Sequence, residues 1–100
     1  MADIVVKLAP DEIMSDFYFT KNPISIAKKN LLSYKEVAVI AIENVSGKNA
    51  ADEMFDLTNN PGRQAEREKC YGRLRSISVG DIVNVDGTDY LCDKFGWIKV

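Results

Sequence analysis

The stretch DIVNVDGTDYL, residues 81–91, places an Asp-Gly pair between two runs of alternating apolar residues. An Asp-Gly pair in this setting is the strongest short-range signal of a β-hairpin, because both positions accept the positive φ of a two-residue type I′ turn. The two-residue loop fixes the register, so that Val85 faces Thr88 and Val83 faces Tyr90. We therefore predict a hairpin with Val83, Val85 and Tyr90 directed into the core.

The residues on either side extend this hairpin. After it, DKFG at 93–96 supplies a turn and WIKV at 97–100 a third strand. Before it, SVGD at 78–81 is typical of a turn, because Ser and Asp side chains bond nearby backbone amides and glycine permits positive φ. The sequence thus predicts a three-stranded antiparallel meander at the C-terminus.

The N-terminal third alternates between strand and helix signals. Residues 3–9 form a strand pattern that Pro10 ends, and residues 10–16 can form one helical turn. The DFYFT stretch at 16–20 is expected to be extended, because aromatic residues favour strands. Asn22 followed by Pro23 starts a helix that we expect to run to residue 32, with Lys28 and Lys29 facing solvent.

The middle of the chain holds a strand and a second helix. Residues 36–44 carry apolar side chains on both faces, which is typical of a central strand covered on both sides. We expect Asn49 to cap the helix, with Asp52 three residues on. Its predicted buried stripe comprises Ala51, Met54 and Phe55, and NNPG at 59–62 ends it.

Together these patterns predict an α+β fold. We expect a small single domain of residues 1–100, built mostly on an antiparallel sheet, with the meander packed against one or two helices.

The absence of histidine excludes Ser-His-Asp and Cys-His catalysis. Ser76 and Ser78 are therefore interpreted as turn residues, because no lysine is placed by sequence to serve as a base. The two cysteines, Cys70 and Cys92, cannot complete a four-ligand zinc site within one chain. We expect no catalytic residues, no metal site, no cofactor and no enzymatic activity.

The hydropathy pattern gives no sign of a membrane partner. The longest apolar run, residues 37–42, is far short of a membrane span. The N-terminus has no basic segment followed by a cleavage-like site, so no signal peptide is expected. These features favour a cytoplasmic location.

The net charge of −2 is unevenly distributed. Residues 63–75 hold five cations and two glutamates, a net +3, which leaves −5 for the rest of the chain. Such a segment is either a solvated connector or a patch that attracts phosphate or an acidic partner. The candidate binding residues are Arg63, Arg67, Lys69, Tyr71, Arg73 and Arg75.

Three motifs resemble the YodL-like domain family. They are ADEMFDLTN at 51–59, SISVGDIV at 76–83 and YLCDKFGW at 90–97. The first departs from the family's larger apolar residues at Ala51 and Thr58, and the last has Trp97 in place of Phe. The resemblance covers about residues 35–100 as a β-α-β-β-β core, with residues 1–34 as an N-terminal extension bearing a strand and a helix. YodL-like domains are often encoded by phages and other mobile elements, and the family implies no particular chemistry.

The leading functional hypothesis is a non-enzymatic accessory protein of a phage or mobile element. It would act in the host cytoplasm as a module that binds a host or phage protein. One alternative is a nucleic-acid-binding protein using the basic segment 63–75, with Tyr71 as a stacking surface, against which the pI of about 5.1 counts. Others are a structural or assembly component, or an enzyme using either Cys70 among the arginines or the aspartates of the meander.

Overall fold

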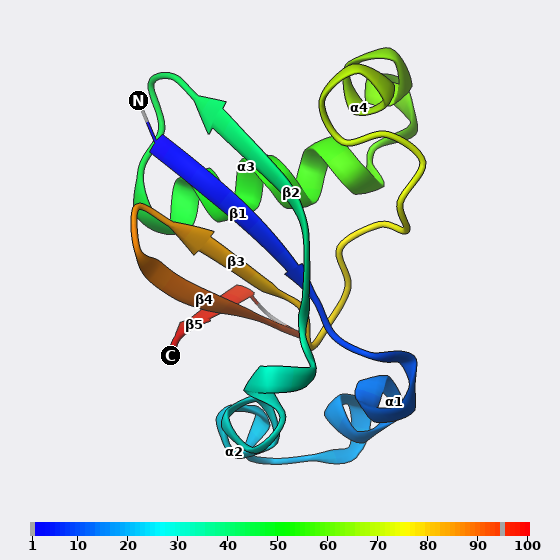
Figure 1. Ribbon diagram of the computed structural model, residues 1–100, viewed down its shortest axis with the longest axis vertical. Coiled ribbons are helices and arrows are strands. Elements are labelled where there is room, and N and C mark those ends of the chain that lie inside the picture. The colour runs from blue at the N-terminus through cyan, green and yellow to red at the C-terminus, as the bar shows by residue number, and fades with distance from the viewer. Residues whose placement is uncertain (1, 95) are drawn as a thin grey trace.

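The computed structural model describes residues 2–94 and 96–100, in which one five-stranded antiparallel sheet is packed by helices on both faces (Figure 1). The strands are β1 (Ala2–Leu8), β2 (Lys35–Ile42), β3 (Ile82–Val85), β4 (Thr88–Asp93) and β5 (Gly96–Lys99), in the spatial order β2-β1-β3-β4-β5. The helices are α1 (Asp11–Phe19), α2 (Pro23–Lys29), α3 (Gly47–Asn59) and α4 (Gln64–Cys70), with 3₁₀ turns η1 (Leu31–Ser33) and η2 (Pro61–Arg63). The predicted α+β class and the predicted three-stranded meander are confirmed, whereas the predicted turn at 93–96 includes residue 95, which lies outside the described residues.

The β3–β4 hairpin has the predicted register. Val85 pairs with Thr88 and Val83 pairs with Tyr90. The turn residues Asp86 and Gly87 have φ of 49° and 90°, as a type I′ turn requires. The turn chemistry of a single dipeptide therefore sets the pairing of two strands.

The N-terminal strand is a central element of the sheet. β1 lies between β2 and β3, and it pairs with both in antiparallel fashion. Residues 1–34, predicted as an extension of a core beginning near residue 35, thus supply the strand that joins β2 to the meander.

β2 is an edge strand, so the prediction of a central strand covered on both sides is wrong. Its Ile40 and Ile42 pack against the core, whereas Val39 on the opposite face is 76% exposed. Apolar residues on both faces of β2 suggested a strand inside the sheet with a layer on each face. In the structure, β1 pairs with one edge of β2, and the face that carries Val39 is left uncovered. A register shift opposite Val6 and Lys7 marks an irregularity in this pairing.

α3 covers one face of the sheet and forms the larger core. Ala51, Met54 and Leu57 are buried against β1, β3 and β4. The expectation of a buried Phe55 is wrong, because this residue is 37% exposed. Its ring lies edge-on to the ring of Trp97, with 6.4 Å between the two ring centroids.

The predicted cap of α3 is also wrong. The helix begins at Gly47, two residues before Asn49. The Asn49 N–H already donates to the Ser46 carbonyl at 3.1 Å, as does Ala50 at 3.3 Å. Helical bonding is therefore established before Asn49 could act as a cap.

α1 and α2 lie at the end of the sheet that is at the bottom of Figure 1, and they pack against part of its opposite face. Phe17 and Ala27 pack there against Ile82 of β3 and Leu91 of β4. The expectation that residues 16–20 are extended is wrong for residues 16–19, which continue α1. The burial of the Phe17 side chain against the sheet outweighs the preference of aromatic residues for strands. No helix in the described ranges is long and apolar enough to cross a membrane.

Candidate functional site

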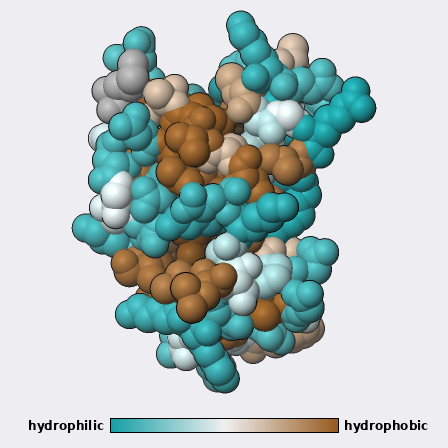
Figure 2. Space-filling view, viewed as in Figure 1, coloured by the Kyte–Doolittle hydropathy of each residue, from teal (hydrophilic) through white to brown (hydrophobic). Residues whose placement is uncertain are grey.

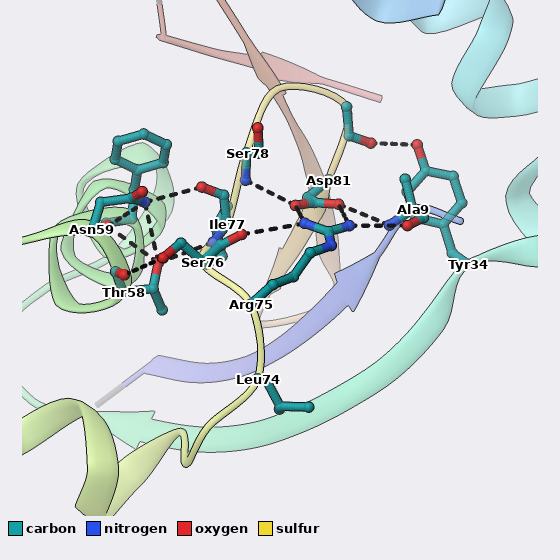
Figure 3. A network of polar contacts seen from close by, with 12 residues as sticks. Ala9, Tyr34, Thr58, Asn59, Leu74, Arg75, Ser76, Ile77, Ser78 and Asp81 are labelled. Carbon is teal, nitrogen blue, oxygen red and sulfur yellow. Dashed lines mark hydrogen bonds and ion pairs between the residues drawn. The ribbon is translucent and has the colours of Figure 1, made fainter. Parts of the chain in front are cut away.

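The SVGD turn is built around the carboxylate of Asp81, which is fully buried (Figure 3). The backbone N–H groups of Ala9 and Ser78 each donate to it at 2.8 Å. The Arg75 guanidinium donates to both of its oxygens, at 2.6 and 2.8 Å. Every lone-pair direction of the carboxylate thus meets a donor, which is how a buried charge is tolerated.

Arg75 is used inside the molecule. Besides Asp81, it donates to the carbonyls of Ala9 at 2.9 Å and Ser76 at 3.2 Å. The hydrogen bonds to Asp81 raise the pKa of Arg75 above its ordinary value. Arg75 therefore ties the end of β1 to the loop before β3.

Arg67 and Ser76 meet at the C-terminal end of α3. The Ser76 hydroxyl donates to the Thr58 carbonyl at 2.6 Å, and Arg67 donates to the same carbonyl at 2.6 Å. Arg67 also reaches the Ser76 oxygen at 3.0 Å and lies over the Tyr71 ring, 5.8 Å from its centroid. These contacts give Ser76 a structural role in closing the helix end.

Tyr71 contributes its hydroxyl to the same network and is otherwise buried. It donates to the Arg75 carbonyl at 2.8 Å, and burial raises its pKa to about 12. A ring this deeply buried offers little surface for stacking a base.

Arg63 joins α3 to α4. It contacts Glu53, and it pairs with Asp56 at 2.9 Å and with Glu66 at 2.9 Å. Of the six predicted binding residues, only Lys69 and Arg73 are exposed. The structure thus brings Arg67, Tyr71 and Arg75 together as an internal brace, with Arg63 tied separately to acidic residues. A binding role for the set stays a prediction.

The two cysteines differ in their exposure to solvent. Cys70 at the end of α4 is exposed, whereas Cys92 in β4 is buried. Burial raises the pKa of the Cys92 thiol to about 12. Within the described residues, no group of three or more Cys, Asp or Glu side chains is placed to hold a metal ion.

The most accessible feature that sequence reasoning missed is the free edge of β2. The backbone of Asp3 faces the β3 side, since its carbonyl accepts from the Asp86 N–H at 2.9 Å and its N–H donates to the Asp86 carboxylate at 2.8 Å. Backbone groups alternate in direction along an antiparallel strand, so Ile4 turns toward its partner Ile40 on β2. The N–H and C=O groups of Val39 therefore point away from β1, toward the open edge.

Two hollows open along β2, between this strand and the segment that connects α3 to β3. One of about 280 Å³ is lined by Ile40, Ile42 and Leu57 among others. Another of about 430 Å³ lies at the opposite end, lined in part by Val37 and Leu74. Figure 2 shows hydrophobic surface over β1 and β2 on this side of the molecule. This surface is exposed because the topology leaves one edge of β2 without a neighbouring strand, and no local sequence signal specifies that topology.

Comparison with protein-family models, with curated proteins and with solved structures finds no match to this chain. The resemblance to YodL-like domains accordingly stays a prediction.

Proposed function

We propose that the protein is a non-enzymatic interaction module that binds a partner protein along the free edge of β2. The observation that supports this proposal is the outward direction of the Val39 backbone groups beside an exposed apolar side chain. An extended segment of a partner can add to such an edge, gaining main-chain hydrogen bonds from the strand.

Side-chain pockets give such an added strand its specificity. The hollow beside Ile40 and the hollow beside Val37 lie at the two ends of the edge, where alternate side chains of a bound segment would enter them. Edge strands commonly carry charges or proline that discourage pairing. The VAVIAI run at 37–42 carries neither, so the charges of Lys35 and Glu36 at the start of β2 and the irregularity near Val37 blunt only one end of this edge.

The setting that we propose is a phage or another mobile element, with a host or phage protein as partner in the host cytoplasm. The resemblance of three motifs to YodL-like domains supports it. Genes flanking the coding sequence test it directly: a run of phage or plasmid genes is expected, and an isolated housekeeping context would count against it.

A pull-down from host lysate with two variants tests the binding mode. Val39→Pro removes an N–H that points outward, so it spares the pairing with β1. The matched control Val39→Thr keeps that N–H and a β-branched side chain. We expect the wild type and Val39→Thr to retain the same specific protein, and Val39→Pro to lose it while remaining folded by circular dichroism. Retention by Val39→Pro would contradict binding at this edge.

Nucleic-acid binding by segment 63–75 makes a different prediction. Filter binding of duplex DNA would weaken steeply as salt rises. The engagement of Arg63, Arg67 and Arg75 with internal partners leads us to expect no measurable binding at low salt. Binding that Lys69→Glu or Arg73→Glu abolishes would favour the nucleic-acid alternative.

A further inference from the structure

Exposed large apolar side chains gather at the end of the molecule that holds α1 and α2. Of the six recorded in the described residues, four lie between residues 18 and 32, namely Tyr18, Phe19, Leu31 and Leu32. Leu32 is fully exposed. In Figure 2 hydrophobic surface lies over η1, bordered by hydrophilic residues. We refer to residues 28–35 as the α2–η1 tip.

The same part of the chain has a one-signed charge. Residues 17–35 contain four lysines and no Asp or Glu. Lys21, Lys28, Lys29 and Lys35 are all exposed, and none forms an ion pair among the residues described. The carboxylates nearest in sequence are Asp16 of α1 and Glu36 of β2, on either side of this run. In space, Asp11 and Glu12 of α1 line the same hollow as Ser33 and Lys35. The positive charge that adjoins the exposed aliphatic surface of the tip is therefore that of Lys28 and Lys29.

The leucines of the tip belong to an ordered turn. The Asn30 side-chain amide donates to the Ile26 carbonyl at 2.9 Å, and the Asn30 backbone N–H donates to the Ala27 carbonyl at 3.1 Å. Ser33 and then Tyr34 continue the 3₁₀ turn, and the Tyr34 hydroxyl donates to the Gly80 carbonyl. Leu31 and Leu32 are thus held outward by bonds on both sides.

The hydropathy pattern gave no sign of a membrane partner because it reveals spanning segments, whereas the α2–η1 tip lies at the surface of the molecule. We propose that the α2–η1 tip adsorbs to an anionic lipid surface. Leu31 and Leu32 would enter the boundary between headgroups and acyl chains, while the flanking lysines meet lipid phosphates. A nucleic acid would also attract the lysines, but its phosphate backbone offers nothing to a fully exposed leucine. The combination of Leu32 with Lys28 and Lys29 is what selects a lipid surface over a nucleic acid.

Sedimentation with vesicles tests this assignment on the full chain. One set contains phosphatidylcholine alone and the other contains phosphatidylcholine mixed with phosphatidylglycerol. We expect the protein to sediment with the anionic vesicles only, and the bound fraction to fall as salt screens the lysines. Leu32→Ser is expected to weaken binding by about tenfold, and the double variant Lys28→Glu/Lys29→Glu by about thirtyfold or more.

The chain offers a matched control for each variant. Val39→Ser removes an exposed apolar side chain from β2, and Lys69→Glu reverses an exposed charge on α4. Both are expected to bind anionic vesicles like the wild type. Three outcomes would overturn the proposal: no sedimentation with anionic vesicles, equal loss in the controls, or binding of duplex DNA that Lys28→Glu/Lys29→Glu abolishes but Leu32→Ser leaves intact.

Discussion

Asp81 shows how one residue can organise several segments. Its carboxylate is bonded by Ala9 after β1, by Ser78 in its own turn and by Arg75 in the preceding loop. Its backbone N–H closes the turn on the Ser78 carbonyl at 3.0 Å. Removing its charge would leave Arg75 without a counter-ion next to buried backbone.

We predict that Asp81→Asn lowers the free energy of unfolding by about 3 kcal/mol, because it breaks a buried ion pair from one side. Urea denaturation monitored by circular dichroism measures the change. The control is Asp89→Asn, since the Asp89 pair with Lys7 at 3.1 Å is partly exposed. That variant should lose no more than about 1 kcal/mol. Equal losses in both variants would show that Asp81 has no special role.

The two thiols are predicted to differ in reactivity. Burial raises the pKa of Cys92 from its ordinary value to about 12, so its reactive thiolate is suppressed at pH 9. We expect iodoacetamide at pH 9 to modify one thiol rapidly in the native protein and two after denaturation. Cys70→Ser should remove the rapid reaction entirely. Fast native labelling in Cys70→Ser would contradict the burial of Cys92.

The raised pKa of Cys92 also makes the free energy of unfolding depend on pH. A neutral Cys92 thiol is favoured by folding, so its contribution is fully present below its unfolded pKa near 9 and is lost as pH rises toward about 12. Tyr71, whose pKa burial raises from 10 to about 12, acts in the same direction. The free energy of unfolding is therefore expected to decline across this alkaline window.

At the scale of elements, α1 is positioned by a contact with the turn before β3. Gly80 has φ of 97°, and a Cβ at this position would overlap the buried ring of Phe17. Gly87 in the hairpin has a similar φ of 90°, but a Cβ there would meet open space. An alanine at either position would be strained, but only an alanine at Gly80 would also overlap a neighbouring side chain. Comparing the two substitutions therefore separates the cost of backbone strain from the cost of overpacking.

We predict that Gly80→Ala lowers the free energy of unfolding by about 3 kcal/mol or more, because strain and overpacking add. Gly87→Ala should cost about 1 kcal/mol from strain alone. Urea denaturation of both variants provides the comparison. A smaller loss for Gly80→Ala than for Gly87→Ala would show that Phe17 is not held against this turn.

Local signals account for the elements that the sequence predicts well. The Asp-Gly turn sets the register of β3 and β4 by itself, and Pro23 after Asn22 marks the start of α2. The place of β2 depends on pairing with β1, about 30 residues earlier in the chain, so its exposed edge follows from topology. The same limit applies to the candidate site: the arginines of 63–75 were visible in the sequence, but their internal partners Glu53 and Asp81 were not.

At the scale of the whole molecule, the sheet separates two cores. α3 closes the larger core on one face, and α1 with α2 closes a smaller core that includes Ile82 and Leu91 on the other. β1 contributes Ile4 and Val6 to the larger core and joins β2 to β3. The first strand of the chain is therefore needed both to form the larger core and to hold β2 in the sheet.

We predict that a fragment of residues 35–100, the extent of the YodL-like resemblance, does not fold alone. Without β1, β2 loses the strand that it pairs with in the sheet, and Asp81 loses the Ala9 N–H. A two-dimensional amide NMR spectrum should show poor dispersion for the fragment and good dispersion for the full chain. Adding a peptide of residues 2–9 should restore part of the dispersion, because it supplies the missing strand. A well-dispersed spectrum from the fragment alone would mean that β2 finds another partner and that β1 is dispensable.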